Sequence, residues 1–284
     1  MSENVAAAAG TIDLGGDLTV NRLGFGAMRI TGDGIWGYPK DREEAKATLR
    51  RAVEMGVNFI DTADSYGPDV SEILIAEALH PYPEDLIIAT KGGKLRPGPF
   101  VRWPEDGRPE HLREVLEGSL RKLRMEQIPL YQLHAPDENV PLEDSIGTLL
   151  EFKEQGKIRH IGVSNFTEEQ LRIAQRITPI VSIQNRFNID DRQSESIVDL
   201  CEQEQIAFIP WAPISNVEGN PAIQDLAQKY EATPHQIVLA WMLARSPAIL
   251  PIPGTGSVAH VEENTKAAAI KLTAAEVAAL SAGN

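Results

Sequence analysis

The fold is decided around one short stretch of the chain, Asn58-Phe59-Ile60-Asp61-Thr62-Ala63-Asp64-Ser65-Tyr66-Gly67. The apolar run at 57–60 predicts a short buried strand that stops at Asp61. Tyr66 comes a few residues later, and the glycine and proline directly after it predict a loop. Two later predicted strands also end in polar side chains, Lys91 and His134. We therefore expect these four side chains to meet at one site.

Outward from this stretch, a short apolar strand followed by a helix repeats along the chain. Eight strands are expected, at residues 23–28, 58–61, 86–91, 128–134, 158–164, 182–185, 207–211 and 248–252. They lack alternation of polar and apolar residues, as parallel strands covered on both faces do. Eight strand–helix units in about 250 residues predict an α/β fold, a closed (β/α)8 TIM barrel. An open doubly wound sheet is the alternative, but Gly24-Phe25-Gly26 lacks the third glycine of its usual fingerprint.

The N-terminal part differs from the repeating units. Residues 11–14 and 18–20 flank Gly15-Gly16, which predicts a β-hairpin. No linker or low-complexity segment interrupts the rest, so residues 1–284 are expected to form a single domain.

Composition excludes several classes of function. A formal net charge of −14 over 284 residues argues against a nucleic-acid partner, because phosphate binding needs a basic patch. No apolar stretch reaches the length of a membrane span, so no membrane is expected as a partner. Cys201 is the only cysteine and fits a buried thiol in a reducing compartment. With no signal-peptide pattern at the N-terminus, a cytoplasmic location is expected.

In a barrel, the carboxyl ends of the strands form the active face. Singly, Asp61 could cap a helix, Lys91 could lie at the surface and His134 could be a core histidine. Together with Tyr66 they suit proton donation to a carbonyl oxygen. A tyrosine with a pKa of about 10 would be made more acidic by a neighbouring ammonium. None of the four supplies a hydride, so a redox reaction would need a cofactor, and the charged Lys91 argues against a metal site.

The order and spacing of Asp61, Tyr66, Lys91 and His134 resemble the catalytic tetrad of the aldo-keto reductases. Residues 156–166, Gly156-Lys157-Ile158-Arg159-His160-Ile161-Gly162-Val163-Ser164-Asn165-Phe166, resemble the fifth-strand signature of that family. The resemblance covers nearly the whole chain. It implies that the N-terminal hairpin closes the bottom of the barrel, and that Tyr66 is the general acid, assisted by Lys91 and Asp61, with His134 positioning the carbonyl.

The resemblance also implies a nicotinamide cofactor. Ser164, Asn165 and Gln184 would hydrogen-bond its carboxamide, and Trp211 would stack on its ring. The full set of implied cofactor residues is Gly26, Ala27, Met28, Asp61, Ser164, Asn165, Gln184, Trp211, Pro213, Gly254, Thr255, His260, Glu263 and Asn264.

The last loop departs from the best-known members of the family. Gly254 and His260 stand where a lysine and an arginine contact the adenosine 2′-phosphate, and Thr255 replaces a serine. Backbone N–H groups of residues 254–257, ahead of a predicted helix, offer an alternative anion site. NADP(H) is therefore the expected cofactor, with NAD(H) as the alternative.

The substrate side is predicted from loop aromatics. Trp36, Tyr38, Trp103 and Phe187 are candidate walls for an apolar or aromatic carbonyl compound, with loop packing as the other interpretation. The expected function is reversible NAD(P)H-dependent reduction of an aldehyde or ketone. The alternatives are a cofactor-binding regulatory subunit, as the potassium-channel β-subunits of this superfamily are, and a cofactor-independent barrel hydrolase or isomerase. The sequence leaves open the substrate, the direction of reaction, and whether the protein is a monomer or a homo-oligomer.

Overall fold

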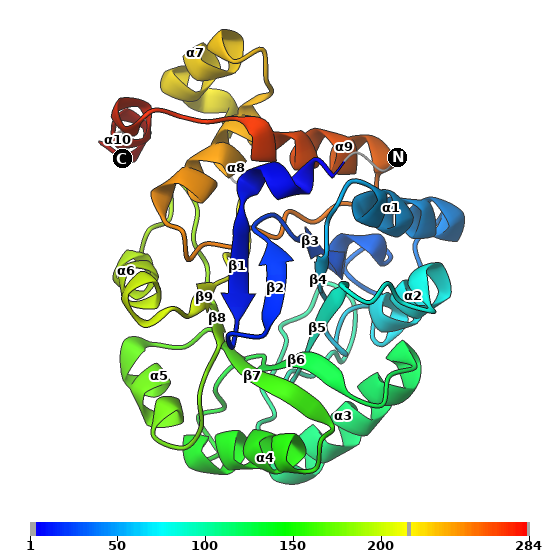
Figure 1. Cartoon of the computed structure of the whole chain (residues 1–284). Helices are drawn as coiled ribbons and strands as arrows, with labels where there is room; N and C mark the ends of the chain where they lie inside the picture. The colour runs from blue at the N-terminus through cyan, green and yellow to red at the C-terminus, as the bar shows by residue number, and fades with distance from the viewer. Residues whose placement is uncertain (1–3, 215–216, 283–284) are drawn as a thin grey trace.

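A computed structural model describes residues 4–214 and 217–282 (Figure 1). Its main sheet has seven parallel strands, and each strand pairs with the next one along the chain. The strands are β3 (Phe25–Gly26), β4 (Phe59–Asp61), β5 (Ile87–Gly92), β6 (Ile128–Leu133), β7 (Ile158–Ser164), β8 (Ser182–Gln184) and β9 (Ala207–Phe208). Because sequential strands are neighbours throughout, the carboxyl ends of all of them lie on one rim.

The eighth predicted strand closes the ring, but irregularly. Phe208 and Ile249 form an isolated parallel bridge, and the Leu250 amide donates to the Phe208 carbonyl at 2.9 Å. On the other side, the Gly24 amide donates to the Pro251 carbonyl at 2.9 Å. Pro251 has no N–H to extend a regular ladder, so the segment pairs without forming a continuous strand. The predicted (β/α)8 barrel is thus confirmed, with its last strand reduced to single bridges.

Helices surround the barrel, as Figure 1 shows. Those of the ring are α1 (Arg42–Glu54), α2 (Val70–Leu79), α3 (Pro109–Leu123), α4 (Leu142–Glu154), α5 (Glu168–Gln175), α6 (Glu195–Glu204), α8 (Pro234–Arg245) and α9 (Val258–Lys266). Two more, α7 (Pro221–Lys229) and α10 (Ala274–Ala282), lie outside the ring near α8. Short 3-10 turns are η1 (Ala6–Ala9), η2 (Ala27–Ile30), η3 (Val217–Gly219) and η4 (Ala267–Ala269). Within the described residues, none of these helices combines the length and the apolar character that a membrane crossing requires.

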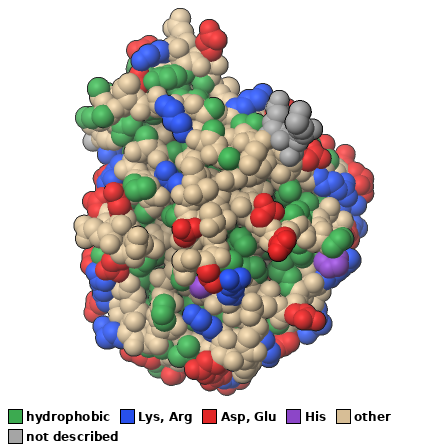
Figure 2. Space-filling model, viewed as in Figure 1, with side chains coloured by type: hydrophobic (Ala, Val, Ile, Leu, Met, Phe, Trp, Pro, Cys, Tyr) green, Lys and Arg blue, Asp and Glu red, His purple; other side chains and the backbone are tan. Residues whose placement is uncertain are grey.

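The predicted hairpin is present as β1 (Thr11–Leu14) and β2 (Leu18–Asn21), and it lies across the end of the barrel that faces the viewer in Figure 1. Three side chains of the hairpin, Leu14, Leu18 and Val20, form one buried cluster with side chains from inside the barrel. The barrel members of this cluster are Phe59, Ile87, Ala89, Leu130, Val181, Ala207, Ile209, Leu250 and Ile252. The hairpin therefore closes the bottom, and the site lies at the opposite rim. On the face shown in Figure 2, acidic and basic side chains are interspersed.

Candidate active site

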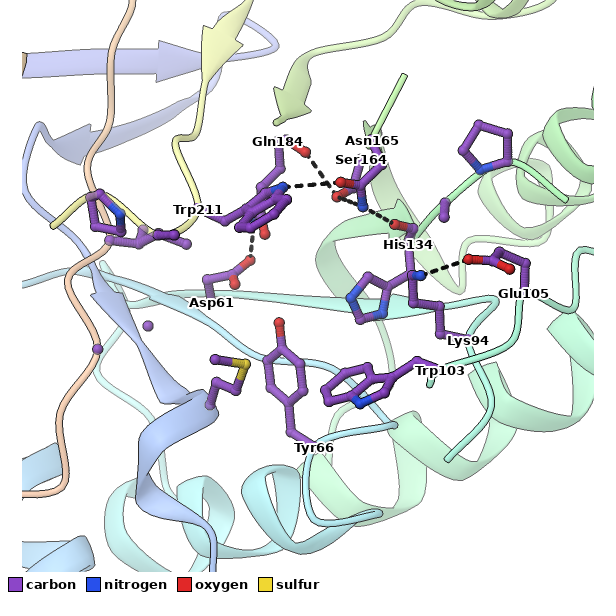
Figure 3. A pocket seen from close by; sticks show the side chains of 18 of the residues that line it. Asp61, Tyr66, Lys94, Trp103, Glu105, His134, Ser164, Asn165, Gln184 and Trp211 are labelled. Atoms are coloured by element: carbon purple, nitrogen blue, oxygen red, sulfur yellow. Dashed lines mark hydrogen bonds and ion pairs between the residues drawn. The ribbon is translucent and has the colours of Figure 1, made fainter. Parts of the chain in front are cut away.

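The structure brings the four predicted catalytic side chains together, and Figure 3 shows three of them, Asp61, Tyr66 and His134. Asp61 ends β4, Lys91 lies in β5, Tyr66 follows β4, and His134 comes directly after β6. The Lys91 Nζ lies 2.6 Å from the Asp61 Oδ2 and 3.4 Å from the Tyr66 hydroxyl. Parallel pairing of β4 with β5 and of β5 with β6 explains the meeting, because adjacent strand ends present their side chains to one rim.

Both carboxylate oxygens of Asp61 accept hydrogen bonds. Its Oδ1 accepts hydrogen bonds from the Gln132 Nε2 at 3.0 Å and the Gln184 Nε2 at 2.9 Å. Lys91 is 0% exposed and also donates to the Thr62 carbonyl at 2.8 Å. Burial acts to lower the pKa of Lys91, but the Asp61 carboxylate and the Tyr66 hydroxyl together raise it above its ordinary value. Lys91 is therefore a fixed cation behind Tyr66.

Lys91 acts to lower the pKa of Tyr66, as expected, but it does not decide the net direction of the shift. Burial raises the pKa of Tyr66 above its ordinary value, and the charge of Lys91 offsets only part of this increase. The sequence showed the lysine but not the burial, which disfavours the phenolate. Tyr66 thus carries its proton at neutral pH, and Lys91 is in place to stabilise the phenolate once that proton has left.

His134 is a neutral imidazole in this site. Burial, followed by the charges of Lys91 and Lys94, lowers the pKa of His134 well below its ordinary value. The Ser65 hydroxyl lies 3.4 Å from its Nδ1. If that hydroxyl donates, the ring proton resides on Nε2, which is then a donor. The imidazole ring lies edge-on to Tyr66 at a centroid distance of 5.8 Å.

A cavity of about 940 Å³ opens in front of these groups. Figure 3 shows the Tyr66 hydroxyl pointing toward the space between Asp61 and His134. The residues of our sequence prediction that line it are Gly26, Met28, Asp61, Tyr66, Trp103, His134, Ser164, Asn165, Gln184, Trp211, Pro213 and Gly254. Ala27 is buried behind the wall.

The polar groups predicted to bind the carboxamide are bonded to one another. The Ser164 hydroxyl donates to the Gln184 carbonyl at 2.8 Å, and the Asn165 Nδ2 donates to the His134 carbonyl at 2.9 Å. The Trp211 Nε1 donates to the Asn165 Oδ1 at 3.0 Å. This network fixes the indole of Trp211 at the cavity wall, beside the polar ends of β7 and β8.

The last loop lies further out. Thr255, His260, Glu263 and Asn264 do not line the cavity. The Ser257 amide donates to the Thr255 Oγ1 at 3.1 Å, and the Val258 amide to the Glu44 carboxylate at 3.2 Å. One of the backbone amides expected to be open to an anion, that of Ser257, is therefore satisfied by a side chain, and so is the next amide along the chain, that of Val258. Glu263 accepts a hydrogen bond from the Thr233 hydroxyl at 2.7 Å.

Sequence reasoning missed Arg29, an exposed residue of η2 that lines the cavity beside Gly254. A Cβ added to Gly254 would lie 3.7 Å from the Arg29 Cγ and 2.7 Å from the Gly26 carbonyl oxygen. Gly254 thus leaves no room for a side chain, and Arg29 lies beside it on the neighbouring segment after β3. No ion pair joins Arg29 to any residue in the described part of the chain. The sequence signal that could have identified Arg29 is its position directly after Met28, which was itself predicted to contact the cofactor.

The substrate wall was predicted only in part. Trp103 lines the cavity, edge-on to Tyr66 at 5.9 Å. Trp36 and Tyr38 lie outside its wall. Phe187 as a wall is wrong: it is 0% exposed and stacks on Trp241 at 5.8 Å, because it points into the core between the barrel and the helices. Lys94 and Glu105, which form an ion pair at 2.9 Å, line the cavity instead.

A second buried carboxyl group lies behind the site. Asp64 is 7% exposed, and its Oδ1 has no hydrogen-bond partner among the described residues. Burial, followed by the charge of Glu72, raises the pKa of Asp64 to about 8. Its folded pKa therefore exceeds its unfolded value, so its contribution to stability is fully present below the unfolded pKa of 3.8 and is lost as the pH rises through about 8.

We expect Asp64→Asn to be more stable than the wild type at pH 8 by a few kcal/mol, since one pKa unit corresponds to about 1.4 kcal/mol. The difference should shrink as the pH falls toward 5. Urea unfolding across this pH range measures it, with Asp85→Asn at an exposed position as the matched control. A pH-independent difference would contradict the assignment.

Comparison with known proteins shows which family the chain belongs to. A family model described as "Aldo/keto reductase family" matches residues 22–284. An uncharacterized oxidoreductase of Schizosaccharomyces pombe is 48% identical over 94% of this chain and 88% of its own length. Pyridoxine 4-dehydrogenase of Escherichia coli is 40% identical over 91% of this chain and 93% of its own. A crystal structure of a thermostable aldo-keto reductase in complex with the inhibitor epalrestat superposes with a TM-score of 0.84 at 32% identity, covering 96% of this chain and 98% of that one. The chain therefore belongs to the aldo/keto reductase family of oxidoreductases.

Proposed function

We propose that the protein catalyses reversible NAD(P)H-dependent reduction of an aldehyde or ketone to an alcohol, with Tyr66 as the general acid. The observation that carries the proposal is the chain of contacts behind the Tyr66 hydroxyl. Lys91 lies 3.4 Å from that hydroxyl, and Asp61 lies 2.6 Å from the lysine. A buried, charged lysine in this position supports transfer of a proton from Tyr66 into the cavity.

In this mechanism, two neutral donors hold the carbonyl oxygen. The Tyr66 O–H and the His134 Nε2–H both donate to it, which polarises the carbonyl bond. When bound, the nicotinamide cofactor supplies the hydride that adds to the carbonyl carbon. Tyr66 then gives its proton to the oxygen, and Lys91 stabilises the phenolate that remains. Asp61 keeps Lys91 charged and oriented throughout.

The cavity fits a nicotinamide cofactor on this rim. Trp211 offers a flat face to the nicotinamide ring, and Ser164, Asn165 and Gln184 offer polar groups to its carboxamide. The Gln184 Nε2 is engaged by Asp61, so its Oε1 is the atom that would accept from the carboxamide. Thr255, His260, Glu263 and Asn264 would hold the adenosine half beyond the cavity.

Arg29 would supply the cation that the last loop lacks. We expect Arg29→Ala to raise KM for NADPH about tenfold, because charge-assisted hydrogen bonds to a phosphate are lost. KM for NADH should change less if the contact is to the 2′-phosphate. Steady-state kinetics with both cofactors measures this, with Arg176→Ala at the exposed C-terminal end of α5 as control. Unchanged KM for NADPH would remove Arg29 from the cofactor site.

The substrate side combines an aromatic wall with charged groups. Trp103 suits a planar ring, and the Lys94–Glu105 pair suits polar substituents on that ring. The 40% identical Escherichia coli relative is named for its action on pyridoxine, a polar aromatic alcohol. We therefore place polar aromatic aldehydes, with pyridoxal among them, first in the substrate class.

The test is a panel of carbonyl compounds, run with NADPH and with NADH. It should include pyridoxal, benzaldehyde and propanal. Turnover that depends on cofactor, fastest with the polar aromatic members, is the expected result. Tight cofactor binding without turnover of any member would favour the regulatory-subunit alternative. Failure of both cofactors to quench tryptophan fluorescence would favour a cofactor-independent reaction.

A further inference from the structure

The loop between β5 and α3, residues 93–108, forms one side of the cavity mouth. Its two ends are joined at a neck, where Lys94 and Glu105 form an antiparallel bridge and an ion pair at 2.9 Å. The Leu95 amide donates to the Pro104 carbonyl at 2.8 Å. These contacts fix the backbone on either side of the loop, but they do not set the orientation of the Trp103 indole that it presents to the cavity.

Arg96, on the opposite strand of this neck, contacts that indole directly. Its guanidinium lies 4.2 Å from the centroid of the Trp103 ring and 5.8 Å from that of Trp36. Its Nη2 donates to the carbonyls of Gly34 and Ile35, the latter at 3.0 Å. One side chain therefore joins the loop after β3 to the loop after β5, with the indole of Trp103 stacked against it.

Burial of this guanidinium without a counter-charge costs free energy. Arg96 is 9% exposed, and no carboxylate in the described residues forms an ion pair with it. Its Nε and Nη1 have no hydrogen-bond partner there. Burial lowers the pKa of Arg96, which is the expected response of a cation without a counter-charge. Hydrogen bonds to two backbone carbonyls and contacts with the indole rings of Trp36 and Trp103 offset part of the cost of burying the charge.

We propose that Arg96 is a specificity-determining residue that positions Trp103 as a fixed wall for planar aromatic carbonyl substrates. The inference rests on the proposed carbonyl reduction and deepens it. Trp103 is edge-on to Tyr66 at 5.9 Å and to His134 at 6.2 Å, so its orientation sets how a planar ring lies relative to both proton donors. A small aliphatic aldehyde reaches the same donors without using the wall.

The test compares benzaldehyde with propanal in Arg96→Met, which keeps an unbranched, flexible side chain but removes its charge and its donors. We expect kcat/KM for benzaldehyde to fall about tenfold, mainly through KM, as for loss of a desolvated cation–π contact. The value for propanal and the Kd for NADPH should change less than twofold. Arg96→Lys, which keeps the charge but not the planar fork, should fall between wild type and Arg96→Met.

A double-mutant cycle distinguishes positioning from general damage to the loop. In a Trp103→Leu background, Arg96→Met should have no further effect on benzaldehyde, because the wall that it positions is gone. Additive effects, or equal losses for benzaldehyde and propanal, would overturn the inference.

A spectroscopic measurement of the Trp103 indole tests the inference even if the protein turns over none of the carbonyl compounds. With 5-fluorotryptophan incorporated, the Trp103 resonance is identified by its absence in Trp103→Leu. Arg96→Met should shift or broaden that resonance and leave the Trp241 resonance, in the core, unchanged. An unchanged Trp103 resonance would overturn the inference. Absence of turnover in the wild type with a displaced Trp103 resonance would instead overturn the proposed function alone.

Discussion

Tyr66→Phe is expected to lower kcat for carbonyl reduction by roughly 10²- to 10⁴-fold, the range that a positioned general acid contributes. The substitution removes only the hydroxyl that lies 3.4 Å from Lys91. The aromatic ring remains, and so do its edge-on contacts with Trp103 and His134. Because the hydroxyl takes no part in the Ser164–Asn165–Trp211 network, cofactor affinity should not change.

Single-turnover reduction measures this effect without interference from product release. Fluorescence titration with NADPH measures cofactor affinity in the same preparation. Tyr38→Phe is the matched control, because Tyr38 also loses a hydroxyl but lies outside the cavity wall. Wild-type turnover in Tyr66→Phe would mean that another group delivers the proton.

Lys91→Met should combine loss of activity with loss of stability. Lys91 is 0% exposed, and its removal leaves the Asp61 carboxylate buried without its counter-charge. Breaking a buried ion pair in this way costs about 3–5 kcal/mol. Turnover should also fall by at least 10²-fold, because the Tyr66 phenolate loses the cation that stabilises it.

The double variant Lys91→Met/Asp61→Asn separates the two effects. Removal of the unpaired charge should restore part of the free energy of unfolding, measured by urea denaturation, but none of the turnover. If Lys91→Met is as stable as the wild type, the buried pair does not hold the charges that we assign to it. Recovery of turnover in the double variant would exclude Lys91 from the proton transfer.

The elements that sequence patterns could predict are those set by local chemistry and strand order. The meeting of Asp61, Lys91 and His134 followed from their places at three consecutive strand ends, and β4, β5 and β6 are consecutive in the sheet. The start of a helix is likewise set by local chemistry: Asp41 directly precedes α1, and its carboxylate accepts from the Glu44 amide at 2.9 Å.

What could not be predicted depends on contacts between distant segments. Phe187 and Trp103 are both aromatic residues after a strand, yet one enters the core and the other faces the cavity. The raised pKa of Tyr66 depends on burial by several loops, which no spacing of residues reveals. Arg29 became a candidate cofactor residue only because β3 lies beside the segment after Pro253 in the closed ring.

The bonds to Asp61 have a consequence for how this enzyme can change. Its carboxylate joins Lys91 of β5, Gln132 of β6 and Gln184 of β8 across the interior of the barrel. Strands that are not neighbours in the sheet thus share one acceptor, so substitution of Lys91, Gln132 or Gln184 should disturb the proposed proton transfer. The hydrogen bonds of Asp61 involve no side chain from the loops at residues 31–40 and 93–108. New substrate ranges should therefore arise by divergence of these loops, while the barrel interior stays nearly invariant among active descendants.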